Sequence, residues 1–298
     1  MVHVSHFFMQ LWGSLIVSFN HSNGNPKNFR RIASNGATTN WSNLGGIGST
    51  KGEIKLGIVQ TTANGFTAGD LFLGAAQPGK IGRISADGST VNTNWATLTN
   101  STQMVGETNL LLGGFYIDRT TVFGGDLIVV SGSGGVWRVA AATNATKVAQ
   151  INEPSSGDGT ALEGVWTVSN DPCKYGPWAG KILTCAEQQN LLCTIDTNGT
   201  VVFFNLSIGV PEDVDLVVTN RNLFCLNFVP TALATSSVLK VPETLLTNFV
   251  DDVLIVEETA ATLVIVHWDG VRFVTRRLSV PGASSLEHVS FAPIEGTP

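Results

Sequence analysis

The sequence predicts an all-β fold, a six-bladed β-propeller that takes in residues 1–298 as a single domain. Three observations lead to this prediction: the composition, a repeated phrase and the turns that follow it. Hydrophobic residues make up 43% of the chain and charged residues only 13%, and there are 32 glycines. This balance is typical of many short strands joined by turns, whereas long amphipathic helices need more charged residues.

The repeated phrase is a glycine, then a polar residue, then an apolar run rich in β-formers, with weaker copies that begin at Asn222 and Asp252. Clear copies are Gly69-Asp70-Leu71-Phe72-Leu73 and Gly125-Asp126-Leu127-Ile128-Val129. The polar residue stands at positions 14, 70, 126, 181, 222 and 252, so successive steps are 56, 56, 55, 41 and 30 residues. Self-similarity at such a period indicates a repeat architecture, here with six units.

Each unit continues with a second apolar strand, a tight turn and a third strand. Lys80 to Ile84 and Leu191 to Ile195 are such strands, and Asp87-Gly88 and Asn198-Gly199 are such turns. Asp-Gly and Asn-Gly between β-rich runs are strong hairpin signals. With an inner strand before each phrase, every unit has four strands, which is the blade of a propeller.

The ends of the chain suggest how the ring closes. The chain finishes on an inner-strand phrase, Glu287 to Phe291, so we expect the C-terminal strand to pair with the N-terminal blade and remove an exposed edge. The fifth unit is irregular, because Phe228 to Leu246 lacks the Asp-Gly turn. Five blades with an insertion, or a seventh blade within Gly36 to Gln60, remain open.

The charge and the length of the apolar runs exclude two classes of protein, and the cysteines leave two alternatives open. The net charge of −6, without a run of Lys or Arg, excludes an electrostatic footprint for nucleic acid. No apolar run reaches the roughly 18 residues that a membrane span needs. Cys185 and Cys193 flank a predicted hairpin turn, and both a disulfide and two buried thiols are compatible with that placement.

Acidic residues stand at the beginnings of the predicted inner strands. In a propeller these strands line a narrow channel, so their carboxylates would converge and repel one another unless a cation compensates them. Oxygen ligands of this kind favour a hard cation, Ca²⁺ first. The alternatives are hydrogen bonds to backbone amides or a spread over both ends of the channel. The candidates are Glu53, Glu107, Glu163, Glu212 or Asp213, and Glu287.

Histidine and tryptophan supply the other candidate site residues. His288 is the one histidine on a predicted inner strand, and we consider it as a general base or as a packed imidazole. Trp41 and Trp95 recur in Thr-Asn-Trp 54 residues apart, and Trp166 lies on an inner strand. These indoles could stack on sugars as in a propeller lectin, or pack between the blades.

The six-unit repeat and the phrases Leu162-Glu163-Gly164-Val165 and Glu212-Asp213-Val214-Asp215 resemble the six-bladed propellers grouped around the NHL repeats, the SMP-30/gluconolactonase family and the streptogramin lyases. The gluconolactonase-like members hold a divalent metal on the axis and hydrolyse lactones. By this resemblance, Glu163, Asn170 and Asp215 are implied as metal ligands.

These observations predict a non-catalytic binding or scaffold propeller in an extracellular or periplasmic location, with a possible cation on the central axis. One alternative is a metal-dependent hydrolase or lyase with its site at the carboxylate-lined end of the channel. A second is a glycan-binding lectin. The expected partner is a small molecule, a glycan or a protein surface, and self-association is possible.

Overall fold

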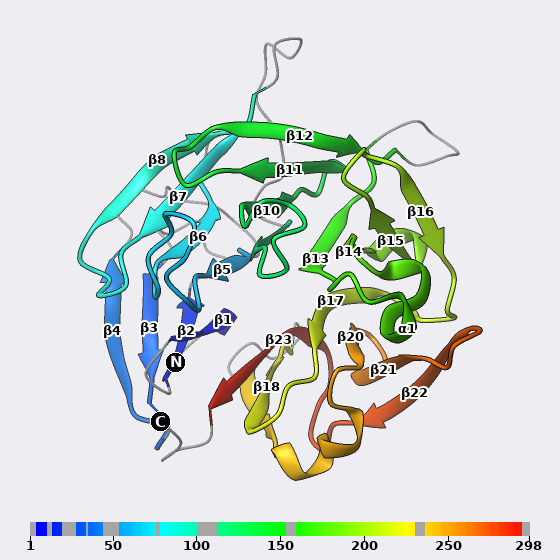
Figure 1. Cartoon of the computed structure of the whole chain (residues 1–298). Coiled ribbons are helices and arrows are strands. Elements are labelled where there is room, and N and C mark those ends of the chain that lie inside the picture. The colour runs from blue at the N-terminus through cyan, green and yellow to red at the C-terminus, as the bar shows by residue number, and fades with distance from the viewer. Residues whose placement is uncertain are drawn as a thin grey trace.

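The predicted six-bladed propeller is confirmed by a computed structural model of the chain (Figure 1). The structure describes residues 4–10, 14–19, 28–33, 35–43, 54–75, 78–99, 113–152, 159–229 and 236–293. Within these ranges the strands form six sheets arranged around a common axis.

In four sheets the strands follow the chain in simple order from the innermost to the outermost. Their strands are β1 (Val4–Gln10), β2 (Ser14–Phe19), β3 (Asn28–Ile32) and β4 (Thr38–Asn43); β5 (Leu56–Ile58), β6 (Leu71–Gly74), β7 (Lys80–Ile84) and β8 (Val91–Thr97); β9 (Gly114–Ile117), β10 (Leu127–Val130), β11 (Gly135–Val139) and β12 (Ala145–Gln150); and β13 (Leu162–Thr167), β14 (Ile182–Ala186), β15 (Leu191–Ile195) and β16 (Val201–Phe204). We call these blades 1 to 4.

The last two blades exchange strands. Blade 5 contains β17 (Pro211–Leu216), β20 (Val253–Glu257), β21 (Thr262–Trp268) and β22 (Phe273–Ser279), while blade 6 contains β18 (Arg221–Asn227), β19 (Ser237–Val241) and β23 (Leu286–Pro293). The chain therefore starts blade 5, builds two strands of blade 6, returns to finish blade 5 and ends in blade 6. This path explains why the last two steps of the sequence repeat are short.

Ring closure differs from the expected pairing with the N-terminal blade. The C-terminal strand β23 pairs antiparallel with β18, and blade 1 has its own inner strand β1. The inner strands contact one another in the order β1, β5, β9, β13, β17, β23 and back to β1. The ring is thus closed by packing of β23 against β1.

Within the described ranges, helical structure is confined to short connections. They are the one-turn helix α1 (Pro172–Tyr175), capped by the Asp171 side chain, and 3₁₀ turns at Gly176–Trp178, Glu187–Gln189, Glu243–Leu245 and Thr247–Phe249. No helix in the described ranges is long and apolar enough to cross a bilayer.

Apolar side chains fill the spaces between neighbouring blades. The cluster between blades 2 and 3, for example, contains the fully buried Phe72 and Trp137. Similar clusters lie between each other pair of neighbours around the ring. Each sheet therefore needs apolar residues on both faces, because each blade packs against two neighbours.

The polar residue of the repeated phrase has a structural role. In blades 1 to 3 it lies just before or at the start of the second strand and binds an arginine on the third strand. Asp70 accepts from Arg83 Nε at 2.8 Å, Asp126 from Arg138 Nη2 at 2.9 Å, and Ser14 Oγ from Arg31 Nε at 2.8 Å. The phrase thus marks a side-chain contact that joins the second and third strands of the blade.

The cysteines are not joined in disulfides: all four are free thiols. Cys185 is paired with Leu192 across the β14–β15 ladder, and Cys193 with Thr184. Side chains alternate along a strand, so the two thiols face opposite sides of the sheet and enter different apolar clusters.

Candidate functional site

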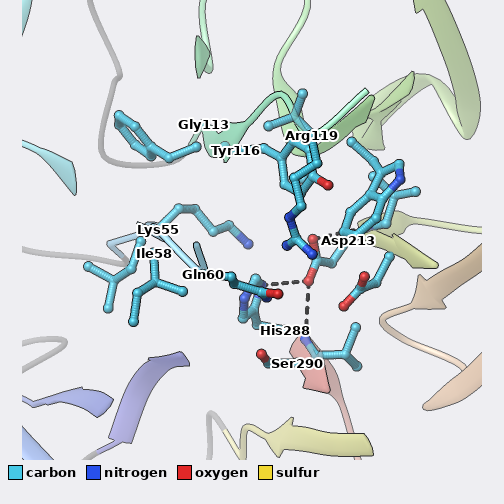
Figure 2. A pocket seen from close by; sticks show the side chains of 18 residues that line it. Lys55, Ile58, Gln60, Gly113, Tyr116, Arg119, Asp213, His288 and Ser290 are labelled. Carbon is cyan, nitrogen blue, oxygen red and sulfur yellow. Dashed lines mark hydrogen bonds and ion pairs between the residues drawn. The ribbon is translucent and has the colours of Figure 1, made fainter. Parts of the chain in front are cut away.

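The six inner strands surround a channel whose two ends have different chemistry. Residues at the beginnings of inner strands contact one another, as do residues at their ends, so these strands run in the same direction along the axis. We call the end where they begin the acidic end and the end where they finish the aromatic end. Between them lies a cavity of about 60 Å³ open to water-sized molecules (Figure 2).

Lys55 and three glutamates form the acidic end, and we call this group the acidic cluster. Lys55, just before β5, lies with its Nζ 3.0 Å from Glu163 Oε2 and in ion-pair contact with Glu212 Oε1. Only 2% of Lys55, 5% of Glu163 and 2% of Glu212 is exposed. Glu187, from the 3₁₀ turn between β14 and β15, brings a third carboxylate, and one oxygen of each glutamate lies within 4.8 Å of the others.

Burial and the neighbouring Glu163 carboxylate raise the pKa of Glu187 to about 7. At neutral pH this half-buried carboxyl is therefore divided between its neutral and ionised forms. The cluster thus holds one ammonium, the two carboxylate groups in contact with it, and a third carboxyl that is partly protonated.

Besides β1, three inner strands carry an irregular register at this end. The ladder shifts between Glu163 and Val165, between Pro211 and Val214, and opposite Glu287. Such a bulge re-aims side chains that would otherwise alternate between faces. In β17 it allows both Glu212 and Asp213 to be buried, with Glu212 on Lys55 and Asp213 on His288.

Gly164 makes the bulge in β13 possible. Its φ is +56°, and a Cβ there would lie 2.7 Å from both Cα and Oδ1 of Asp213. Any larger residue would push β13 away from β17. The glycine therefore sets the distance between the two strands that supply Glu163, Glu212 and Asp213.

Asp213 and His288 form a buried pair on the pocket wall. His288 Nδ1 lies 2.6 Å from Asp213 Oδ2, which also accepts a hydrogen bond from the Val289 amide at 3.1 Å. Burial by itself would raise the pKa of Asp213, but His288 and these hydrogen bonds hold it below its usual value. The pair links blades 5 and 6 and fixes the orientation of the imidazole.

The aromatic end consists of Tyr116, Arg119, Trp166 and Asp215. The rings of Tyr116 and Trp166 lie 4.3 Å apart between centroids, and the Arg119 guanidinium lies 5.1 and 5.2 Å from them. Figure 2 shows Arg119 extending into the pocket, on the opposite side from Ser290. Among the described residues, no carboxylate lies within ion-pair distance of Arg119.

Arg119, Arg221 and Asp215 are charged or titratable groups at the aromatic end. Burial and the charge of Asp213 raise the pKa of Asp215 to about 7, so this carboxyl is only partly ionised. Burial and the Arg119 guanidinium lower the pKa of the nearby Arg221, which places a second guanidinium in the same region. Two arginines thus face one partly protonated carboxyl, in a chain whose net charge is −6.

The sequence-predicted residues are distributed unevenly over this site. Glu163, Asp213, Asp215, Trp166 and His288 are at the channel. Glu287 is buried on β23 but does not line the pocket, and Asn170 is exposed beyond the end of β13 beside Gly180. Glu53 and Glu107 lie outside the described residues.

The two other candidate tryptophans pack against the apolar clusters between neighbouring blades. Trp41 lies edge-on to Phe29 at 6.4 Å, and Trp95 lies 4.6 Å from Phe72. Lys55, Glu187, Tyr116 and Arg119 were not singled out from the sequence. Lys55 stands just before an inner strand, at the position that the acidic candidates also occupy. This position is the one feature of the sequence that indicates its place at the channel.

The acidic cluster as built does not fit a divalent metal ion. Ca²⁺ takes oxygen ligands at about 2.3–2.6 Å, and the three glutamates supply oxygens close enough together. However, the Lys55 ammonium already contacts two of them. Calcium at this point stays a prediction, and it would require Lys55 to leave the cluster.

No protein-family model matches the chain, and no curated protein matches it. Solved structures of similar fold include a streptogramin B lyase (TM-score 0.50, 10% identity, 95% of this chain and 84% of that one). An auxiliary nutrient-binding protein from Bacteroides ovatus has a TM-score of 0.50 and 11% identity over 72% of this chain and 54% of that one. Virginiamycin B lyase from Staphylococcus aureus has a TM-score of 0.49 and 13% identity over 90% of this chain and 68% of that one. The similarity to the streptogramin B lyase, at a TM-score of 0.50, confirms the resemblance to this group of propellers at the level of fold.

Proposed function

We propose that this protein is a binding propeller that holds a small molecule in its axial pocket, with an anionic group of the ligand on Arg119. The observation that carries this proposal is the placement of Arg119. Its guanidinium is held over two aromatic rings, extends into the pocket and has no carboxylate within ion-pair distance among the described residues.

The ligand class follows from the groups around Arg119. A guanidinium offers a fork of donors suited to carboxylate or phosphate. Trp166 and Tyr116 add apolar ring surface beside it, and the partly neutral Asp215 reduces the repulsion that an anion would meet. We therefore favour a small anion with a planar apolar part over a glycan or a protein surface.

Isothermal titration with matched ligand pairs tests this proposal. Benzoate, phenyl phosphate and indole-3-acetate are compared with the neutral benzamide and indole-3-acetamide. We expect heat and saturation for at least one anion and a loss of more than tenfold in affinity for its neutral counterpart. The Arg119→Met variant should lose the same preference.

Arg276→Met is the matched control, because Arg276 also lies over an aromatic ring, 5.0 Å from the centroid of Phe249, but outside the pocket. It should bind like the unmodified protein. Equal binding of charged and neutral ligands, or an Arg119→Met variant that keeps the preference for the anion, would contradict the proposal.

A second candidate function is proton transfer by His288, as in a hydrolase or lyase. The observation that favours it is the Asp213–His288 pair, because a carboxylate on Nδ1 orients an imidazole as a general base. A panel of lactones tests it, with turnover expected for the unmodified protein and lost in His288→Asn. Absence of turnover across the panel at 1 mM substrate would leave binding as the better account.

The extracellular or periplasmic location stays a proposal with its own test. Fractionation of the source cells, followed by immunodetection, should recover the protein outside the cytoplasmic fraction. Recovery together with a cytoplasmic marker enzyme would contradict this location.

A further inference from the structure

Lys55 reaches across the channel from the opposite side of the ring. It stands before β5 in blade 2, whereas Glu163 belongs to blade 4 and Glu212 to blade 5. All three side chains are almost completely buried. A single ammonium therefore joins three blades at the acidic end.

We propose that Lys55 is the resident cation of the acidic cluster: its ammonium occupies the place that a divalent metal ion would take, and it closes this end of the channel. The inference does not depend on the proposed ligand. In this role Lys55 compensates the charge of the carboxylates, so that the acidic end needs no metal ion.

The geometry makes Lys55 and a metal ion mutually exclusive. An ion that binds three oxygens at about 2.3–2.6 Å needs those oxygens within about twice that distance of one another, and the glutamate oxygens meet this condition at 4.8 Å. Such an ion would lie beside the Lys55 Nζ, which is 3.0 Å from Glu163 Oε2 and also in contact with Glu212. Two cations that close together repel strongly, so one must leave.

The cluster needs one cation. Ionised carboxylates buried side by side are strongly unfavourable without a compensating charge. Lys55 supplies it through direct contact with Glu163 and Glu212. Removal of the ammonium should therefore create an affinity for a divalent ion that the unmodified protein does not have.

The experiment measures thermal unfolding and Ca²⁺ titration of the full chain, in EDTA and in 1 mM CaCl₂. The unmodified protein should have the same Tm in both and bind no Ca²⁺ at the cluster. Lys55→Met should lose roughly 5 °C or more in EDTA and recover at least half of this loss in CaCl₂, with saturable Ca²⁺ binding.

Two further variants separate charge from packing. Lys55→Met combined with Glu212→Gln removes one charge of each sign, so it should regain stability in EDTA and respond less to Ca²⁺. Lys174→Met is the matched control, because Lys174 also pairs with a carboxylate, Asp251, but both side chains are more than 40% exposed. It should change neither Tm nor Ca²⁺ binding.

Three results would overturn the proposal. One is a saturable Ca²⁺-dependent rise in the Tm of the unmodified protein that is absent in Glu163→Gln. The second is a Lys55→Met variant as stable as the unmodified protein in EDTA, and the third is a folded Lys55→Met variant that binds no Ca²⁺. If Lys55→Met does not fold in EDTA, refolding in 10 mM CaCl₂ decides. Recovery of the folded state supports the proposal, and failure to recover it contradicts the proposal.

Discussion

The two ends of one channel use charge in opposite ways. At the acidic end, Lys55 forms ion pairs with Glu163 and Glu212, and all three side chains are almost completely buried. At the aromatic end, Arg119 is exposed and rests on aromatic rings, with no described carboxylate in ion-pair reach. The first arrangement stabilises the ring, whereas the second leaves a charge available to a ligand. Whether a charged side chain at the centre of a propeller stabilises the ring or binds a ligand therefore depends on its burial and its partners.

The largest expected difference is in stability when each cation is removed. Loss of one partner from a buried ion pair leaves an uncompensated charge, so Lys55→Met should cost about 3–5 kcal/mol in free energy of unfolding. Arg119→Met should cost less than about 0.5 kcal/mol, because a surface substitution disturbs little packing. Urea denaturation of both variants measures this contrast.

Equal losses in the two variants would contradict the contrast between the ends. A large loss in Arg119→Met alone would show that the aromatic end is structural and would remove the main argument for a ligand there. The Ca²⁺ response described above then decides separately about Lys55.

Gly164→Ala should have the next largest effect, on the order of 2 kcal/mol. The added Cβ would lie 2.7 Å from Asp213, so β13 and β17 must separate, and the acidic cluster and the Asp213–His288 pair both depend on that spacing. Gly282→Ala is the matched control, since Gly282 also has a positive φ, +84°, with nothing within 4 Å of the added Cβ. If the two variants lose the same free energy, backbone strain alone explains the effect and close strand contact is not required.

The regular blades were predictable because local signals and sheet membership coincide there. In blades 2 and 3 the repeated polar residues Asp70 and Asp126 begin second strands that pair with the next strands along the chain. In blades 5 and 6 the repeat still marked β18 and β20 as second strands. It could not show that β18 pairs with β23 and β20 with β17, because strand pairing across a long interval leaves no local pattern.

The candidate site was partly predictable for a related reason. The position of an acid before an apolar strand drew attention to Glu163 and Glu212, which the fold brings together. Lys55 has the same position but the opposite charge, so a pattern of acidic residues does not include it. The Asp213–His288 pair depends on bulges in β17 and β23, and a bulge in one strand of a ladder is not visible from alternation alone.

The smallest predicted effect is a fall in stability with rising pH, to which one carboxyl at each end contributes. The pKa of Glu187 in the folded protein is about 7, against an ordinary value of 4.5. Between these values the folded state binds more protons than the unfolded state, so the free energy of unfolding falls as pH rises from about 4.5 to 7. Asp215, also with a pKa of about 7, adds a second contribution of the same sign.

Glu187→Gln and Asp215→Asn each mimic the protonated carboxyl, so each should flatten the fall in Tm over this pH range. Both variants should match the unmodified protein near pH 4.5 and exceed it near pH 8, by a modest amount because these side chains are partly exposed to solvent. A saturating anion at the aromatic end, if the proposed function holds, should favour neutral Asp215 and steepen the slope in Glu187→Gln but not in Asp215→Asn. Equal slopes in all three proteins would show that neither carboxyl titrates in this range, and the electrostatic difference between the two ends would then rest on Lys55 and Arg119 alone.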